Sequence, residues 1–293
     1  MNPDDARLED LRRSSASKML QLRELVAGTG SALVAFSAGV DSTFLLAVAR
    51  EVLGERAVAL TAHSPSVPQA EREAARELAR RLGVQHLEVT SREGEDPRYV
   101  ANPVDRCYYC KSELYRLCEA AARERGLAAI LDGFNADDRR DHRPGHRAAL
   151  ERGVRSPLAE VGLAKEEIRA WSQAYRLPTW DKPQMACLAS RLPYGTQVTV
   201  ERLNKVGGAE KAVRALGLKN FRVRFHGEVA RLEVAAEELP LLLEAQFRAR
   251  LDAAIKAQGF TFVAVDLEPF RSGRLNDALR KEGPGLSLPV LAG

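Results

Sequence analysis

The stretch SALVAFSAGVDSTFLLAVAREVLG, residues 31–54, decides how the first half of the chain folds. It begins with a short apolar run that is typical of a buried parallel strand. After the loop that begins at Ser37, apolar residues recur at helical spacing until Gly54, and glycine commonly ends a helix. We therefore predict a strand over 31–38, a tight loop, and a helix over 42–54.

Strands and helices continue to alternate after this first unit. Apolar runs and helical spacing predict strands over 56–64, 84–91 and 127–134, and helices over 69–83, 110–125 and 165–177. Alternation of this kind produces a parallel sheet that is covered by helices. The predicted fold class is α/β, with a Rossmann-like parallel sheet.

The pattern changes after a stretch around 178–195 that is rich in proline and glycine. Downstream, the sequence predicts a helix over 199–216, strands over 221–227 and 229–235, a long helix over 237–258, and a strand over 260–268. This order is that of a small α+β unit. We therefore predict two domains, 1–197 and 198–293.

Composition limits the class of protein. The chain has 293 residues, of which 45% are hydrophobic and 29% charged, and it contains no apolar run that approaches a membrane span. Its amino terminus lacks the build of a signal peptide, so we expect a cytoplasmic protein with no membrane partner. The formal charge of +4 is mild. It suits a phosphate-bearing ligand better than a nucleic acid.

The loop SAGVDST, residues 37–43, lies where the predicted strand meets the amino end of the helix, a place where anions bind. Gly39 permits a tight backbone, and the hydroxyl groups of Ser37, Ser42 and Thr43 suit phosphate oxygens. The GxxxxGK[ST] pattern is missing, so this is not a Walker loop. We interpret it as a nucleotide-phosphate loop. The alternative is an ordinary turn in which the aspartate caps the helix.

A second polar segment, DGFNADD at 132–138, closes a later predicted strand. Asp132 and Asn135 carry oxygen atoms that suit ribose or Mg²⁺. The same residue types are common in plain turns, so this alternative stays open.

The four cysteines fall into two groups. Cys107 and Cys110 form a C-x-x-C, which suggests a redox pair, half of a zinc site or part of an iron-sulfur site. Cys118 fits the apolar face of a helix and is expected in the core. With Cys187, the C-x-x-C supplies three thiolates, which leave one position open on a four-iron cluster or on zinc. Three unrelated thiols are the alternative.

Arg222 and Arg224 stand two apart on a predicted strand, so both lie on one face of the sheet. Two guanidinium groups so placed can grip one phosphate. A solvated strand face is the alternative.

Seven segments together resemble the LarE family over nearly the whole chain: SAGVDST, RCYYCK, DGFNADD, SPLAEVGLAKEEIR, CLASRLPYGT, FRVRFHGEVARLE and FRSGRLND. The loop SAGVDST alone resembles only the wider PP-loop ATP pyrophosphatase superfamily, and CLASRLPYGT and FRVRFHGEVARLE are far more specific. The resemblance implies the PP-loop fold with a smaller C-terminal α+β domain. Ala38 departs from the family pattern, since glycine is commoner there.

LarE proteins are sulfur transferases that make the pincer ligand of the nickel cofactor of lactate racemase. The resemblance therefore implies an ATP-dependent sulfurtransferase that acts on pyridinium-3,5-biscarboxylic acid mononucleotide. ATP and Mg²⁺ would adenylate a carboxylate and release pyrophosphate, and sulfur would then displace AMP. AMP is a far better leaving group than a carboxylate oxygen.

The resemblance also implies roles for the cysteines. Members with a single cysteine in the CLASR segment give up its sulfur and end with dehydroalanine. Members that also have a C-x-x-C are thought to hold a [4Fe-4S] cluster that carries an extra sulfide. The family pattern thus assigns Cys107, Cys110 and Cys187 as cluster ligands, with Cys187 also catalytic and assisted by Arg191.

Further roles follow by matching motifs. The expected ATP site contains Ser37, Gly39, Asp41, Ser42, Thr43, Asp132 and Asn135. Arg222 and Arg224 would bind the substrate phosphate in the C-terminal domain, which would also serve oligomerisation. The expected Mg²⁺ ligands are Asp41, Glu210 and Glu233. The family suggests a homo-oligomer, and nothing in the sequence indicates the source of sulfide.

Three other functions use parts of the same pattern. A PP-loop tRNA thiolase also adenylates, and some groups have three cysteines, but neither the mild charge nor the small C-terminal unit suggests RNA binding. An amide-forming synthetase of the NAD or GMP kind would need no cysteine chemistry. A nucleotide-binding regulator would bind ATP without releasing pyrophosphate.

Overall fold

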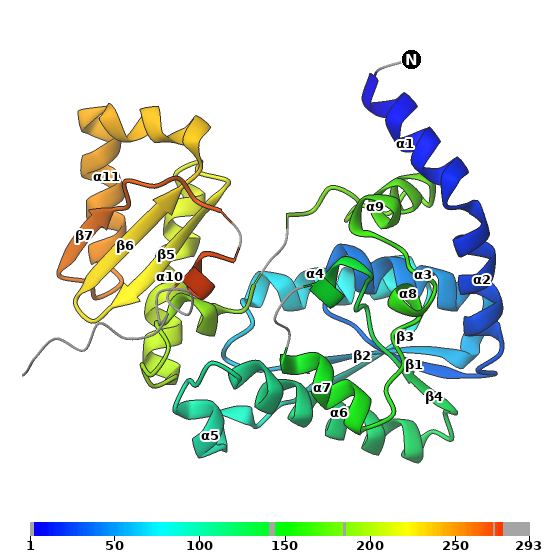
Figure 1. The fold of residues 1–293 in the computed structure, drawn as a ribbon. Coiled ribbons are helices and arrows are strands. Elements are labelled where there is room, and N and C mark those ends of the chain that lie inside the picture. Colours follow the sequence, from blue (N-terminus) through cyan, green and yellow to red (C-terminus); the bar gives the residue numbers. More distant parts are fainter. Residues whose placement is uncertain (1–2, 141–143, 184–185, 272, 278–293) are drawn as a thin grey trace, which may run out of the picture. The chain divides into compact units, whose positions relative to one another are not determined.

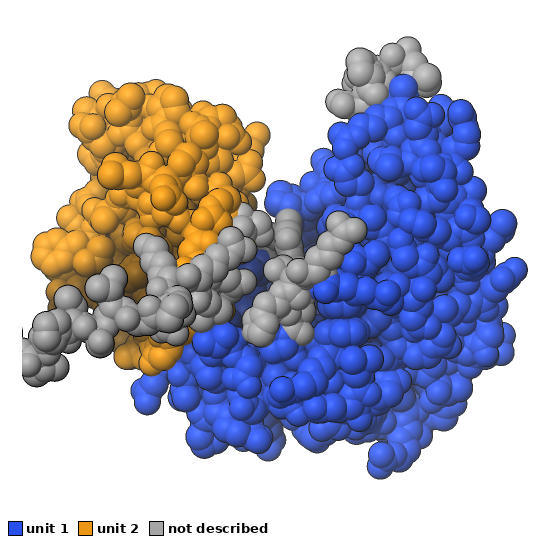
Figure 2. Space-filling model, viewed as in Figure 1, with its two compact units in different colours: residues 1–187, 197–199 blue, residues 188–196, 200–293 orange. Residues whose placement is uncertain are grey.

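The computed structural model of the chain describes residues 3–140, 144–183, 186–271 and 273–277. The chain forms two compact units, the first made of 1–187 with 197–199 and the second of 188–196 with 200–293 (Figure 2). Near the predicted boundary the chain alternates between the units, because 188–196 belongs to the second and 197–199 to the first. The boundary predicted between 197 and 198 lies within this region.

Within the described residues, the first unit has a parallel sheet of four strands in the order β3-β2-β1-β4 (Figure 1). The strands are β1 (Ala32–Ala35), β2 (Ala57–His63), β3 (Gln85–Thr90) and β4 (Ala129–Leu131). Val34 lies opposite Ala59 on one side and Leu131 on the other. The α/β fold class is confirmed.

The helices of this unit are α1 (Pro3–Ser14), α2 (Ala16–Ala27), α3 (Val40–Leu53), α4 (Gln69–Arg81), α5 (Pro97–Val100), α6 (Arg106–Glu124), α7 (Pro144–Glu151), α8 (Pro157–Glu160) and α9 (Lys165–Ala174). Short 3-10 turns lie at Gly54–Arg56, Glu93–Glu95 and Asp137–Arg140. Helix α6 begins four residues before the predicted position, so Cys107 lies in its first turn and Cys110 at the start of its second.

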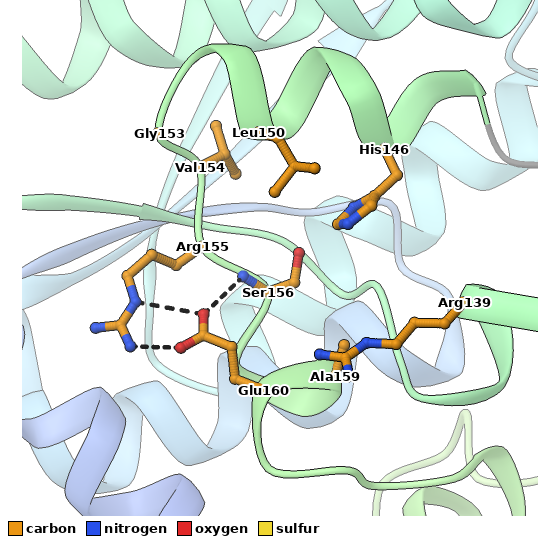
Figure 3. A pocket seen from close by; sticks show the side chains of 9 residues that line it. All are labelled: Arg139, His146, Leu150, Gly153, Val154, Arg155, Ser156, Ala159 and Glu160. Carbon is orange, nitrogen blue, oxygen red and sulfur yellow. Dashed lines mark hydrogen bonds and ion pairs between the residues drawn. The ribbon is translucent and has the colours of Figure 1, made fainter.

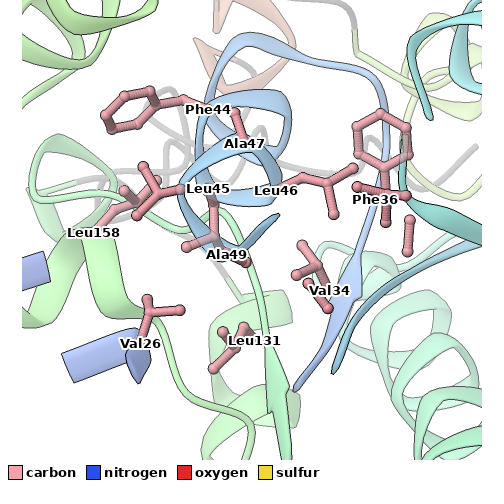
Figure 4. Packing of buried hydrophobic residues seen from close by; sticks show 14 of the residues in the cluster. Val26, Val34, Phe36, Phe44, Leu45, Leu46, Ala47, Ala49, Leu131 and Leu158 are labelled. Carbon is pink, nitrogen blue, oxygen red and sulfur yellow. The ribbon is translucent and has the colours of Figure 1, made fainter. Parts of the chain in front are cut away.

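Side chains of β1 alternate between two cores, as expected for a strand that is buried on both faces. Val34 belongs to a core with Phe44 of α3 (Figure 4). Leu33 belongs to a second core with Tyr115 and Cys118 of α6. Helices therefore cover both faces of the sheet. Cys118 is fully buried, which confirms its predicted place in a core.

The second unit has a sheet in the order β5-β6-β7, with β5 (Phe221–His226) antiparallel to β6 (Val229–Val234) and β7 (Phe262–Val265) parallel to it. Its helices are α10 (Val200–Ala215) and α11 (Ala245–Lys256), and 3-10 turns lie at Leu188–Arg191, Ala236–Leu243 and Arg274–Asn276.

The long helix predicted over 237–258 is wrong. The chain forms a 3-10 segment over Ala236–Leu243, becomes extended at Glu244, and only then enters α11. Pro240 lies inside the 3-10 segment, and proline lacks the amide hydrogen that a continuous α-helix needs at this point.

Candidate active site

The loop between β1 and α3 is closed by its own hydroxyl groups. Ser42 Oγ lies 3.1 Å from Ser37 Oγ and 3.3 Å from the amide nitrogen of Ser37. Gly39 precedes α3 with an extended backbone. Thr43 Oγ1 is buried and has no hydrogen-bond partner within the described part of the chain. The hydroxyl groups of Ser37 and Ser42 thus meet at the amino end of α3, a position that suits an anion.

Ala38, within this loop, has a φ of 55°, in the left-handed region that favours glycine. A non-glycine residue there costs about 1–2 kcal/mol. The conformation explains why glycine is commoner at this position of the motif. Here the Ala38 carbonyl is held from outside the loop, since it accepts a hydrogen bond from Lys182 Nζ at 3.1 Å.

Asp41 lies at the start of α3 and is contacted by two distant segments. Its carboxylate accepts hydrogen bonds from Lys165 Nζ at 2.5 Å and from Asn135 Nδ2 at 3.3 Å. The segment that carries Asn135 runs against the loop, because a side-chain carbon at Gly133 would lie only 2.9 Å from the backbone nitrogen of Ser42. The structure therefore brings Asp41 and Asn135 together.

Asp132 faces the interior of the first unit. Its carboxylate accepts hydrogen bonds from Tyr115 Oη at 2.6 Å, from Ser156 Oγ at 2.7 Å and from the Phe134 amide at 3.2 Å. Burial, and then the charge of Asp132, raise the pKa of Tyr115 well above its usual value. Asp132 therefore anchors the segment next to the loop. Its role in binding nucleotide stays a prediction.

Sequence reasoning missed two lysines that contact the loop. Lys165, the first residue of α9, pairs with Asp41, and Lys182 Nζ donates to Glu71 Oε2 at 2.7 Å as well as to Ala38. Both lysines are distant from the loop in sequence. A lone lysine beside a helix start or a proline looks like an ordinary solvated charge, so only the fold reveals them.

The cysteine site is formed by the start of α6 and the segment at Cys187. Cys107 is exposed, while Cys110 and Cys187 are half-buried. Burial raises the pKa of Cys110, and the charges of Glu93, Cys187 and Cys107 raise it further. The two other thiols thus lie within electrostatic range of Cys110. Glu93, a buried carboxylate that accepts a hydrogen bond from Ser91, was not predicted as a neighbour.

Among the residues that the structure describes, no group of three or more His, Cys, Asp or Glu side chains is close enough to hold a metal ion. The three thiols are neighbours, but they are not gathered at ligand distance. The donor set still has the chemistry that a cluster requires, namely three sulfur ligands from two adjacent segments.

The predicted residues of the second unit form ion pairs. Arg191 Nε and Nη2 donate to the two oxygens of Glu210 at 2.8 and 2.9 Å. Arg224 donates to Glu233 at 2.8 Å, and Glu233 also accepts from Arg231 at 3.2 Å. These side chains are almost fully buried except that of Arg231. The carboxylates expected to bind Mg²⁺ are therefore shared with arginines.

Arg222 lies on β5 two residues before Arg224. Its guanidinium lies 4.7 Å from the centre of the Phe270 ring, and Nη1 donates to the Phe221 carbonyl at 2.7 Å. Burial, and then the charge of Arg191, lower the pKa of Arg222 to about 10. Arg191 and Arg224 thus disfavour the charged form of Arg222, whereas a bound anion would favour it.

A cavity of about 330 Å³ lies elsewhere in the first unit, beside α7 (Figure 3). His146 and Arg139 lie on one side of it, and an ion pair between Arg155 and Glu160 lies on the other. None of the residues predicted for the active site is among the described residues that line it.

Comparison with known proteins connects these features. The family model of asparagine synthase matches residues 23–226. A protein of Synechocystis, described as uncharacterized, is 45% identical over 90% of this chain and 99% of its own length. The pyridinium-3,5-bisthiocarboxylic acid mononucleotide synthase of Lactiplantibacillus plantarum is 38% identical over 85% of this chain and 90% of its own length.

The chain belongs to the LarE family. This LarE family member is an ATP-dependent, adenylating sulfurtransferase of the PP-loop class, so the predicted enzyme class is confirmed. Family membership also implies ATP as a substrate and Mg²⁺ as a cofactor. None of the helices within the described residues is long and apolar enough to cross a membrane.

Proposed function

We propose that this LarE family member converts the carboxylates of pyridinium-3,5-biscarboxylic acid mononucleotide into thiocarboxylates for the nickel-pincer cofactor of lactate racemase. The observation that carries the proposal is the similarity to the L. plantarum synthase, whose name states the bisthiocarboxylic product. The hydroxyl-lined loop and the buried arginines of β5, Arg222 and Arg224, support it, since ATP and the substrate both carry phosphate.

The first step takes place at the loop between β1 and α3. Ser37, Ser42 and Thr43 bind ATP phosphates there, and Asp41 binds Mg²⁺ together with them. A substrate carboxylate oxygen attacks the α-phosphorus, and the bond to pyrophosphate breaks. Asn135 donates a hydrogen bond to the carboxylate of Asp41 and so holds Asp41 in place.

Sulfur then attacks the carbonyl carbon of the adenylate, and AMP leaves with the former carboxylate oxygen. We assign Cys107, Cys110 and Cys187 as ligands of a [4Fe-4S] cluster. A cluster held by these three residues would supply the sulfide for this attack. The thiols must lose their protons to bind iron, and Cys110 holds its proton tightly in the chain alone.

Arg222 and Arg224 bind the substrate phosphate in this proposal. Arg191 donates to Glu210, and Glu210 Oε1 also accepts a hydrogen bond at 3.2 Å from the amide of Val223. Val223 is the residue between the two arginines, so Arg191 helps to position this part of β5. Glu210 and Glu233 stay predicted Mg²⁺ ligands, and an ion there would share their oxygens with arginines.

Metal analysis tests the cysteine assignment. Protein purified and reconstituted without oxygen should contain iron and acid-labile sulfide, and Cys107→Ala, Cys110→Ala or Cys187→Ala should lose most of both. Cys118→Ala is the matched control, because this thiol is buried in a core and should not affect iron content. Zinc without iron, or equal iron in all variants, would contradict the assignment.

Substrate choice tests the reaction itself. Pyrophosphate release should require the pyridinium mononucleotide, and Cys187→Ser should release pyrophosphate without forming thiocarboxylate. Release that depends on tRNA would favour a tRNA thiolase. Ammonia-dependent turnover that survives Cys187→Ser would favour an amide-forming synthetase.

We further propose a cytoplasmic homo-oligomer in which residues 198–293 bind the substrate phosphate and contribute to the contacts between subunits. Light scattering should give a mass that is a multiple of the 32.2 kDa chain. A monomer at micromolar concentration would contradict this part of the proposal.

A further inference from the structure

Lys182 connects the phosphate loop with the segment that leads to the catalytic cysteine. Its Nζ donates to the Ala38 carbonyl at 3.1 Å and to Glu71 Oε2 at 2.7 Å. Ala38 is the left-handed residue of the loop, and Glu71 lies in the first turn of α4. The ammonium group therefore lies against the loop although the lysine is far from it in sequence.

The backbone of Lys182 is fixed from the other side. Arg169 of α9 donates to the carbonyls of Trp180 and Lys182, each at 2.9 Å, and the Lys182 amide donates to the Thr179 carbonyl at 3.0 Å. These contacts set the backbone position of Lys182, while its long side chain remains adjustable. Its side chain is 21% exposed and that of Glu71 is 19% exposed, so both can be reached from solvent.

Charge explains why a lysine is paired at this place. Asp41 and Glu71 both lie at the loop that we assign to the ATP phosphates, and two carboxylates would repel a polyphosphate. Asp41 is paired with Lys165, and Glu71 is paired with Lys182. Mg²⁺ can compensate a carboxylate that binds it. We have assigned such a role to Asp41 but not to Glu71.

We propose that Lys182 is a phosphate-binding residue of the ATP site, and that Glu71 holds its ammonium group until ATP arrives. Lysine has three donor hydrogens. It can keep the Ala38 carbonyl while it exchanges the carboxylate of Glu71 for a phosphate oxygen. This inference rests on the proposed assignment of residues 37–43 as the ATP loop.

Calorimetric titration of the full chain with ATP and Mg²⁺, and separately with adenosine, tests the proposal. Lys182→Met should weaken ATP binding about tenfold or more, the loss expected for a charge-assisted hydrogen bond. Adenosine binding should stay unchanged, because adenosine has no phosphate. Lys182→Arg should recover most of the affinity for ATP.

Two further variants separate phosphate binding from a purely structural role. Glu71→Gln removes the competing partner, so it should tighten ATP binding by about two- to fivefold, whereas it would weaken binding if Lys182 were only a brace. Lys18→Met is the matched control. Lys18 Nζ also bridges a carbonyl and a carboxylate, of Gly162 and Glu167, at 2.9 and 2.8 Å. The Lys18→Met variant should therefore leave ATP affinity unchanged.

Equal loss of ATP and adenosine affinity in Lys182→Met, or weaker ATP binding in Glu71→Gln, would overturn this inference alone. Failure of the unaltered protein to bind ATP would overturn the proposed function, and this inference with it.

Discussion

Both units of the molecule contain pairs of opposite charge at their predicted sites, but the pairs differ in kind. At the loop of the first unit, lysines pair with Asp41 and Glu71, and all four side chains are between 19% and 28% exposed. In the second unit, arginines pair with Glu210 and Glu233, and all four side chains are at most 8% exposed.

The difference indicates two uses of charge. A lysine that makes a partly exposed contact can change partners at little cost, because water replaces what is lost. A buried arginine held by two parallel hydrogen bonds, as Arg191 is by Glu210, cannot do so without leaving a charge unpaired. We infer that the lysine pairs of the first unit can rearrange when ATP binds, whereas the arginines of the second unit are fixed before any ligand binds.

Removing a buried carboxylate should have the largest effect. Glu233→Ala leaves Arg224 without its buried partner and Arg231 with Asp266 alone. We expect it to lower the free energy of unfolding by about 3–5 kcal/mol, measured by urea denaturation. Arg80→Ala, which breaks the exposed pair with Glu77, should cost less than about 1 kcal/mol. Equal losses in the two variants would remove the contrast.

Removing a lysine at the loop should affect activity rather than stability. Lys165→Met removes the ammonium group that positions Asp41, but the side chains are partly exposed, so the free energy of unfolding should change by less than about 1 kcal/mol. Pyrophosphate release, measured under saturating ATP, should fall about a hundredfold, because a misplaced Asp41 would no longer orient the reacting groups. A loss of stability like that of Glu233→Ala would show that the lysine pair is structural after all.

The contribution of the Glu88–Arg76 ion pair to stability should be smaller than that of a buried carboxylate, and it should depend on pH. The hydrogen bond from Arg76, and then that from His63, lower the pKa of Glu88 from its usual 4.5 to about 2. A lowered pKa stabilises the fold above pH 4.5, and this contribution disappears as the pH falls towards 2.

Glu88 is 30% exposed, so Glu88→Gln should cost only about 1 kcal/mol at neutral pH. The difference from the unaltered protein should vanish near pH 2, as thermal unfolding across the pH range would show. A difference that does not change with pH would contradict the role of this pair.

The smallest expected effect concerns the backbone of the loop. Ala38→Gly relieves the left-handed strain but gives the unfolded chain more freedom, so we expect a net gain of roughly 0.5 kcal/mol. The Ala38 carbonyl remains available to Lys182. A clear fall in the melting temperature would show that the alanine methyl group contributes packing that outweighs the strain.

Sequence patterns predicted the elements that local periodicity determines. The apolar run of β1 and the helical spacing of α3 were visible because both are buried in long stretches. The charged α1 has no clear apolar stripe from which it could be predicted. The helix predicted over 237–258 does not form as one element, because Pro240 cannot continue an α-helix.

The site could be predicted only where a residue type carries its own chemistry. Thiols, a hydroxyl-rich loop and an R-x-R pattern are visible in the sequence as candidates, and their roles stay predictions. Partners brought together by the fold are not visible there, so Lys165, Lys182 and Glu93 were missed. The hydrogen bonds of Asp132 with Tyr115 and Ser156 could not be read from the sequence either, and its predicted role in binding nucleotide stays a prediction.

The central proposal is that the three cysteines hold a cluster that would supply sulfide to an adenylated carboxylate, and that none of the cysteines is consumed. The most direct test is a reaction without oxygen, with ATP, Mg²⁺, sulfide and the pyridinium mononucleotide, followed by counting thiocarboxylates per chain and measuring the protein mass. The account predicts repeated turnover with Cys187 intact. A single turnover that leaves dehydroalanine at Cys187 would contradict it.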